Sequence, residues 1–191
     1  MDMGSKLKST SDVVSFLEKQ GELLRIKEEV NPYLEMAEIQ RRIYKDKGPA
    51  VLFENLKDCD FPCISNIYGT PKRAKLLFSS TYNAVRSIIG AKANPMGIFR
   101  HPAGAFKIIA TAGKGLPIKI SNAAAPVMQC RGNLSDLPQI VSWPQDGGAF
   151  ITLPQVYSEH PNYSGKPLKS NLGMYRIQLS GNEFKTNQEV G

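Results

Sequence analysis

The stretch Gly48-Pro49-Ala50-Val51-Leu52-Phe53 decides the class of fold expected for the first part of this chain. A glycine and a proline end the preceding element, and the four apolar residues that follow are typical of a short buried strand. Residues 63–67 form a second apolar run bounded by turn residues, and residues 23–27 are predicted to be a third strand. Helical patterns precede, separate and follow these strands. The sequence therefore predicts a small α/β unit.

Four helices are predicted around these strands, over residues 12–20, 32–45, 71–78 and 82–89. Ser11 is the expected N-cap of the first helix, and Gly21 is expected to end it in the left-handed conformation. Thr70 and Pro71 are the expected cap and first residue of the third helix. After Gly90, the pattern changes to short apolar pieces separated by Gly, Pro and Asn.

The change of pattern places a domain boundary near residue 116, which gives an N-terminal α/β domain over 1–116 and a β-rich unit over 117–191. Strands are predicted over residues 118–121, 127–129, 151–154 and 174–179. The polar residues from Leu179 to Gly191 contain no closing element, so the β-rich unit is expected to be incomplete. The overall fold class is thus α+β or α/β, with a small α/β domain followed by a β-rich unit.

Composition excludes several classes of protein. The apolar runs are far shorter than the roughly 20 residues that cross a bilayer, and the first residues lack the pattern of a secretion signal. A cytoplasmic protein with no transmembrane segment is therefore expected. Three cysteines are an odd number and predict free thiols rather than a disulfide framework. Cys59 and Cys63 have no second Cys or His pair at a spacing that suits zinc.

Charge is concentrated in one region of the chain, whose net charge is +7. Residues 61–135 contain no Asp or Glu and ten basic residues: Lys72, Arg73, Lys75, Arg86, Lys92, Arg100, Lys107, Lys114, Lys119 and Arg131. Such a block attracts a phosphate, a nucleic acid, an acidic protein surface or merely solvent ions. Nucleic acid is disfavoured because no stacking aromatic residues are interleaved with the charges.

Two segments in the second half carry candidate chemistry. Trp143-Pro144-Gln145-Asp146-Gly147-Gly148 is either a tight turn leading into a strand or a close approach of backbone to a ligand. In Asn171-Leu172-Gly173-Met174-Tyr175-Arg176, a strand from Leu172 would place Met174, Arg176 and Gln178 on one face. Tyr175 and Ile177 would then lie on the other. Arg176 needs an anion, either a salt-bridge partner, a carboxylate or a phosphate. Asn171 offers an oxygen ligand of the kind that Mg, Ca or Mn prefers.

The order of the segments resembles that of the UbiD family of decarboxylases over about residues 12–180. The resemblance rests on residues 16–26, 48–55, 69–73, 125–127, 137–138, 143–152 and 171–176. It implies a small N-terminal α/β domain, a split β-barrel of the flavin-reductase type and a third domain used in oligomer assembly. This chain would contain the first domain and the beginning of the barrel.

The resemblance also implies a function. UbiD-family enzymes are carboxy-lyases that reversibly decarboxylate aromatic or α,β-unsaturated carboxylic acids, including the polyprenyl-hydroxybenzoate of ubiquinone biosynthesis. They use prenylated FMN supplied by the flavin prenyltransferase UbiX, with Mn²⁺ or another divalent metal and K⁺ at the cofactor phosphate. The full-length protein is expected to be a homo-oligomer, with no nucleic acid as partner.

Four residues match the family's functional positions. Asn171 matches a metal ligand, and Met174, Tyr175 and Arg176 match the stretch beside the flavin. Arg176 also matches the arginine that contacts the substrate carboxylate and pairs with a catalytic glutamate. The family's histidine and glutamate ligands and its acidic proton donor lie downstream of Gly191, so this chain alone is expected to be inactive. The alternative is a non-catalytic binding or assembly module that docks on an acidic partner through residues 61–135.

Overall fold

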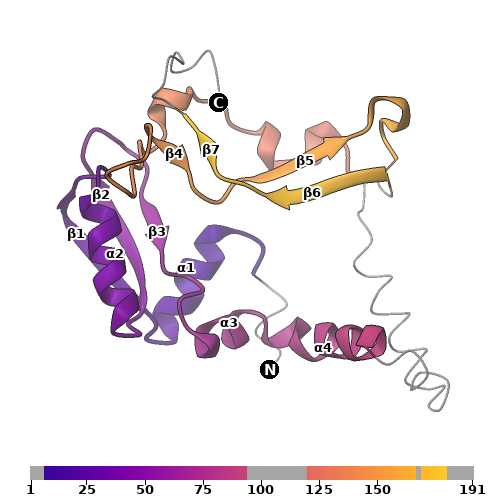
Figure 1. Ribbon diagram of the computed structural model, residues 1–191, viewed down its shortest axis with the longest axis horizontal. Helices are drawn as coiled ribbons and strands as arrows, with labels where there is room; N and C mark the ends of the chain where they lie inside the picture. Colours follow the sequence, from indigo (N-terminus) through magenta and orange to yellow (C-terminus); the bar gives the residue numbers. More distant parts are fainter. Residues whose placement is uncertain (1–6, 94–119, 167–168, 180–191) are drawn as a thin grey trace.

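The structure is a computed structural model that describes residues 7–93, 120–166 and 169–179 (Figure 1). The first part contains four helices and three strands: α1 (Thr10–Lys19), β1 (Leu23–Val30), α2 (Glu35–Lys45), β2 (Ala50–Leu56), β3 (Cys63–Ser65), α3 (Pro71–Leu77) and α4 (Ser79–Ala93). The second part contains short 3₁₀ turns and four strands: β4 (Phe150–Ile151), β5 (Gln155–Glu159), β6 (Ser170–Met174) and β7 (Ile177–Gln178). The predicted domain boundary lies outside the described residues.

The sheet of the first part has the order β1-β2-β3, with β1 parallel and β3 antiparallel to the central strand β2. Helix α2 is the connection between the two parallel strands, which need a crossover of this kind. Residues Ala50 to Phe53 are all buried, as the continuous apolar run of a central strand requires. The predicted α/β arrangement is confirmed.

Helix boundaries follow their capping groups. The first helix begins earlier than predicted, because Ser9 rather than Ser11 is its N-cap: Ser9 Oγ accepts a hydrogen bond from the backbone N–H of Asp12, and the Asp12 carboxylate accepts one from that of Ser9. This reciprocal box needs an acceptor three residues after the cap, where Ser11 would have Val14. Gly21 has the predicted left-handed conformation, with φ 68°.

The later boundaries were predicted with mixed success. Thr70 caps α3 through its hydroxyl, as expected. Helix α2 begins at Glu35 instead of Pro32, since Leu34 has a φ of 64° that no helix admits. No helix among the described residues is long and apolar enough to cross a bilayer.

The second part departs from the predicted strands. The predicted strand over residues 127–129 is not formed, because Pro126–Met128 is a 3₁₀ turn. The proline at its first position has the fixed φ that suits such a turn. Ile120 and Ser121 are also outside any strand. Most importantly, the predicted strand over residues 174–179 is interrupted: β6 pairs with β5, whereas β7 pairs with β4.

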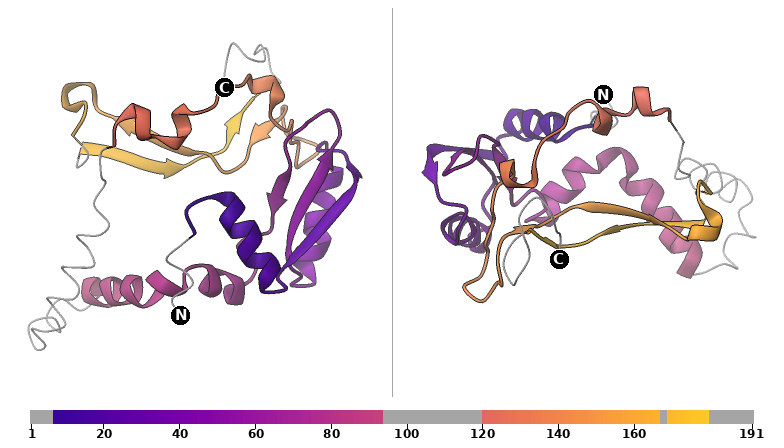
Figure 2. Two further views of the ribbon diagram at one scale, coloured as in Figure 1. Left: turned by 180° about the vertical axis from the view of Figure 1, so that it is seen from behind. Right: turned by 90° about the horizontal axis from the view of Figure 1, so that it is seen from above.

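Residues Ile140 and Val141 connect the two parts. Ile140 packs in the core beneath β2, and Val141 packs in a separate cluster with Ala149 and Leu179. The backbone of Val141 also bonds to the first part, since its carbonyl accepts from Leu34 N at 2.9 Å. Strands β4 and β7 therefore lie beside the α/β unit, and the β5–β6 ribbon extends away from it (Figures 1 and 2).

Arg73 is a structural residue, although the sequence places it in the basic block. Its side chain is 0% exposed, and its guanidinium donates to the carbonyls of Ile67, Asn66 and Gly48. It also forms an ion pair with Glu22 at 3.1 Å. The buried arginine thus ties the start of α3 to the loop after β3 and to the residues that precede β1 and β2. It is not available to an external anion.

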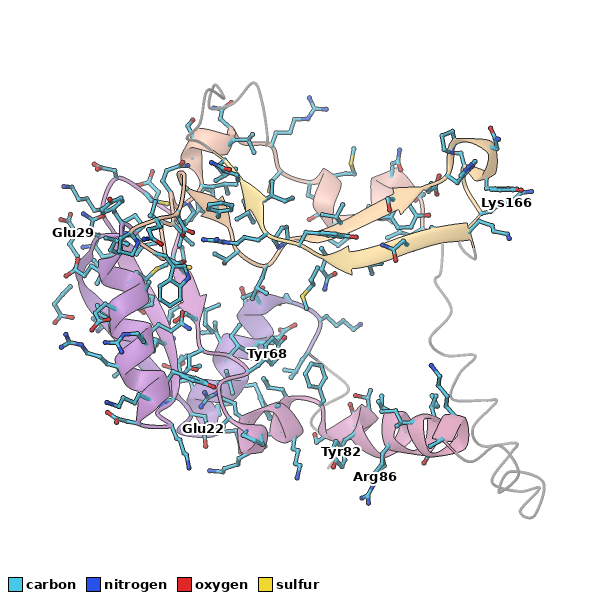
Figure 3. All side chains as sticks on the ribbon, in the orientation of Figure 1. Glu22, Glu29, Tyr68, Tyr82, Arg86 and Lys166 are labelled. Carbon is cyan, nitrogen blue, oxygen red and sulfur yellow. The ribbon has the colours of Figure 1, made fainter. Side chains whose placement is uncertain are left out.

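Replacing Arg73 with methionine is expected to lower the free energy of unfolding by about 3 kcal/mol, because three carbonyls lose the guanidinium donor and Glu22 loses the buried one of its two cationic partners. The matched control is Arg86→Met. Figure 3 shows Arg86 on α4, pointing away from the molecule, so its loss is expected to change stability by less than about 0.5 kcal/mol. Urea unfolding of both variants measures the difference. Equal effects would show that the buried network does not stabilise the fold.

Candidate functional site

The β5–β6 ribbon separates the residues of the 171–176 segment onto two faces. Asn171 and Gly173 alternate with Leu172 and Met174 along β6, so the two pairs point in opposite directions. Across the ladder, Leu172 is opposite Tyr157. Leu172, Met174 and Tyr157 are all exposed and form an apolar face. The predicted metal ligand Asn171 and the predicted flavin contact Met174 therefore lie on opposite faces.

Tyr175 folds back over the ribbon. A Cβ added to Gly173 would lie 2.7 Å from the Tyr175 ring, so only a glycine allows the ring to lie where it does. The ring's hydroxyl reaches Asn171, whose Nδ2 is 3.4 Å away. The spacing of Asn171, Gly173 and Tyr175 thus has a physical reason: an amide, a gap and an aromatic ring fit together on one face.

Arg176 lies where the strand is interrupted, and its guanidinium turns toward β4. The predicted grouping of Met174, Arg176 and Gln178 on one strand face is wrong, because Tyr175 and Arg176 belong to neither ladder. The guanidinium carbon is 3.7 Å from the centre of the Phe150 ring, a cation–π contact. The predicted need of Arg176 for an anion is met by Asp146.

Asp146 accepts hydrogen bonds from two parts of the chain. Its Oδ1 is 3.0 Å from Arg176 Nη1, and its Oδ2 accepts from Arg176 Nη2. Oδ2 also accepts from the backbone N–H groups of Ser142 and Trp143, each at 3.1 Å. The hydrogen bonds from Arg176 and from these two backbone groups hold the pKa of the Asp146 carboxyl below its ordinary value.

The turn that Asp146 closes also forms one wall of a groove. Trp143, 61% exposed, lies with Pro144 and Leu153 on one side, and residues of α2 and β3 form the other. The groove has a volume of about 780 Å³ and a mostly apolar lining. The tight-turn interpretation of the 143–148 segment is therefore correct, and the turn has a hollow beside it.

Metal-binding and nucleophilic groups are sparse in the described part of the chain. It contains no cluster of three or more His, Cys, Asp or Glu residues that could hold a metal. Burial raises the pKa of the Cys63 thiol to about 11, which leaves it protonated and unreactive at neutral pH. His160 caps a 3₁₀ turn by accepting from Asn162 N, and His101 lies outside the described residues.

The structure thus brings together one pair of predicted site residues, Asn171 and Tyr175, and directs Arg176 elsewhere. Two residues beside Arg176 were not predicted to act with it, Asp146 and Phe150. The position of Asp146 before two glycines in a predicted turn indicated that it could be functional. Nothing in the sequence, however, indicates that it pairs with an arginine 30 positions later.

Comparison with known proteins shows which family this chain matches. The model of the 3-octaprenyl-4-hydroxybenzoate carboxy-lyase N-terminal domain matches residues 14–92. That of the Rift-related domain of the same carboxy-lyase matches residues 118–188. The chain belongs to the UbiD family. The resemblance inferred from the order of its segments is confirmed.

Several UbiD-family relatives match most of the chain. A Chlamydia pneumoniae protein, named as one of the subunits of a 4-hydroxybenzoate decarboxylase, is 36% identical over 174 residues, which are 86% of this chain and 28% of that protein. Vanillic acid decarboxylase of Sedimentibacter hydroxybenzoicus, in its closed form, superposes with a TM-score of 0.69 at 25% identity, over 95% of this chain and 36% of that one.

A third match shows the UbiD fold alone. An evolved dimeric form of the UbiD-class enzyme HmfF from Pelotomaculum thermopropionicum, in complex with prFMN, has a TM-score of 0.63 at 23% identity. It is matched over 90% of this chain and 36% of that one. The chain therefore spans only about a third of the length of these three proteins.

Replacing Gly173 with alanine is expected to displace the Tyr175 ring and to separate its hydroxyl from Asn171, because the new methyl group occupies the place of the ring. The ring is half exposed and can turn into solvent, so stability should fall by less than about 1 kcal/mol. The side-chain amide resonances of Asn171 report the change.

Gly90→Ala is the matched control for this substitution. Gly90 has no atom within 4 Å of an added Cβ and lies in helix α4, where alanine should raise stability by about 0.5–1 kcal/mol. Asn171 resonances that are the same in Gly173→Ala as in the parent chain would show that glycine is not needed for the ring.

Proposed function

We propose that this chain supplies the carboxylate-recognition part of a UbiD-type decarboxylase acting on aromatic or α,β-unsaturated carboxylic acids. One observation carries the proposal: a half-exposed arginine in a family segment is held against an aromatic ring and an aspartate. A guanidinium is permanently charged and matches a carboxylate with two parallel hydrogen bonds. Arg176 is thus suited to orient the acid group that is lost as carbon dioxide.

The apolar face of the ribbon suits a planar cofactor. Leu172, Met174 and Tyr157 are exposed side by side, and an aromatic ring system would cover them at a gain of about 25 cal/mol per Å² buried. Prenylated FMN supplies an electron sink when bound, which stabilises the negative charge left by decarboxylation. In this proposal Met174 packs against the flavin. The Tyr175 ring lies on the opposite face of the ribbon and would contact the flavin only after it has moved.

Asn171 is the residue of the described chain that would take part in metal binding. Its Nδ2 donates to Tyr175, which leaves its carbonyl oxygen as the atom for Mn²⁺ or a similar hard cation. A single amide oxygen does not make a metal site. The remaining ligands of Mn²⁺, and those of K⁺ at the cofactor phosphate, must come from elsewhere in the protein.

The wider organisation is part of the same proposal. Residues 1–116 form the N-terminal α/β domain, and residues 117–191 form the first strands of a split β-barrel. The whole protein is a cytoplasmic homo-oligomer that receives its cofactor from a UbiX-type enzyme. Support comes from the family matches on either side of the boundary.

The experiment is an assay of carbon dioxide release by the protein expressed from its gene together with a flavin prenyltransferase, using a panel of aromatic and α,β-unsaturated acids. Turnover is expected, and Arg176→Lys should reduce it by about a hundredfold because an ammonium cannot hold the carboxylate in two places. Arg86→Lys, at an exposed position on α4, is the matched control.

Residues 1–191 by themselves, mixed with prenylated FMN and Mn²⁺, should show neither a stoichiometric flavin spectrum nor turnover. Their described part offers one amide oxygen and one arginine but no cluster of metal ligands. Turnover that Arg176→Lys leaves intact, or a flavin-loaded protein that decarboxylates none of the acids, would contradict the proposed function.

A binding or assembly module is the second candidate, and helix α4 favours it. The helix carries an exposed apolar stripe of Tyr82, Val85 and Ile89, which continues from Phe78, beside the exposed cations Arg86 and Lys92. Such a surface suits an acidic partner. Of the basic residues over 61–135, Arg73 is buried and therefore contributes nothing to such a surface, and the exposed Lys72 is paired with Glu22. Association that weakens with salt, in a protein without turnover, would favour this candidate.

A further inference from the structure

We infer that Asp146 is the positioning residue for the carboxylate-binding arginine: it holds the Nη1/Nη2 edge of Arg176 and leaves the Nε edge for the substrate. The inference rests on the proposed function and deepens it by saying which atoms of Arg176 receive the acid. A guanidinium has two edges that can each hold a carboxylate by two hydrogen bonds, one formed by the two terminal nitrogens and one that includes Nε.

The terminal edge is already occupied in the folded chain. Asp146 receives Nη1 on one oxygen and Nη2 on the other, which is the two-point geometry that fixes the plane of a guanidinium. Phe150 covers one face of the same group at 3.7 Å. Within the described residues, Nε donates to no acceptor. An incoming carboxylate therefore meets the Nε edge of an arginine whose orientation is already set.

Asp146 is held more firmly than the arginine it pairs with. Its side chain is 9% exposed, against 38% for Arg176, and its Oδ2 also caps the backbone N–H groups of Ser142 and Trp143. The neighbouring Val141 is anchored in the core and bonded to Leu34. The position of Asp146 is therefore fixed by the α/β unit, and Asp146 in turn fixes the orientation of the Arg176 guanidinium.

The backbone bonds of Asp146 also argue against a simpler role. If its carboxylate only stood in for the substrate, an incoming acid would displace it. Displacement would leave the backbone N–H groups of Ser142 and Trp143 without their acceptor and would open the turn that carries Trp143. The substrate carboxylate is thus expected to join the aspartate on the guanidinium rather than replace it.

The test uses the 191-residue chain, sodium benzoate as the probe and ¹⁵N NMR of arginine side chains. In the free protein the four Nη protons of Arg176 should be resolved, because the pair with Asp146 hinders rotation of the guanidinium. Asp146→Asn should average them. Asp136→Asn is the matched control, because the Asp136 carboxylate caps a turn through Asn133 N and holds no arginine within the described residues.

Benzoate should shift Nε of Arg176 and leave the Trp143 amide resonance in place. Its affinity should fall roughly tenfold in Asp146→Asn, a loss equal to about 1.4 kcal/mol, and stay unchanged in Asp136→Asn. Asp146→Glu, which restores the charge, should recover part of the loss. Circular dichroism confirms that each variant is folded.

Three results would overturn the inference: averaged Nη resonances in the parent chain, benzoate affinity in Asp146→Asn equal to or tighter than in the parent, or a benzoate-induced shift of the Trp143 amide. The proposed function fails separately. If the Nη resonances are locked by Asp146 but benzoate does not shift Nε, carboxylate recognition by Arg176 is wrong, and the positioning role of Asp146 stands.

Discussion

The carboxylate of Asp146 is the group on which the arrangement of the site depends. It accepts two hydrogen bonds from Arg176 and one each from the backbone of Ser142 and Trp143. One side chain thereby shapes the turn beside the groove and aims the arginine that follows β6. Charge explains why an aspartate serves here, because a neutral amide could accept at only one atom and would not attract a guanidinium. The arginine in turn lies on the ring of Phe150, so three segments meet at this point.

The position of that carboxylate is determined by contacts of the preceding residues with the α/β unit. Ile140 packs among the residues beneath β2, and Val141 exchanges backbone hydrogen bonds with the segment before α2. The turn with Asp146 begins immediately afterwards, and it leads into β4, which pairs with β7. A side chain that must meet a substrate in one orientation is best supported by a rigid element. The β5–β6 ribbon, in contrast, extends away from the unit, and its apolar face is exposed. A cofactor or further strands could pack against this face.

Local patterns predicted the elements that local physics determines. The run after Gly48-Pro49 is the central strand β2, Thr70 and Pro71 begin a helix, and Gly21 ends one. The sequence-based predictions were wrong where a contact between residues far apart in the chain determines the structure. Tyr175 and Arg176 leave the strand because β6 and β7 have different partners, and Arg73 is buried because carbonyls from two loops converge on it. The family was predicted from the order of its segments, whereas the partner of Arg176 was not, since 30 residues separate the pair.

In the function that we propose, Arg176 is a pre-oriented carboxylate receptor and Asp146 is its support. A ¹³C NMR titration of the Asp146 carboxyl group tests this most directly. The pair predicts a pKa below the ordinary aspartate value of 3.8, since the folded state favours the charged form. It also predicts a return toward that value in Arg176→Gln, where the main cause of the shift is removed. A carboxyl that titrates at or above 3.8 in the parent chain, or is unaffected by Arg176→Gln, would contradict it.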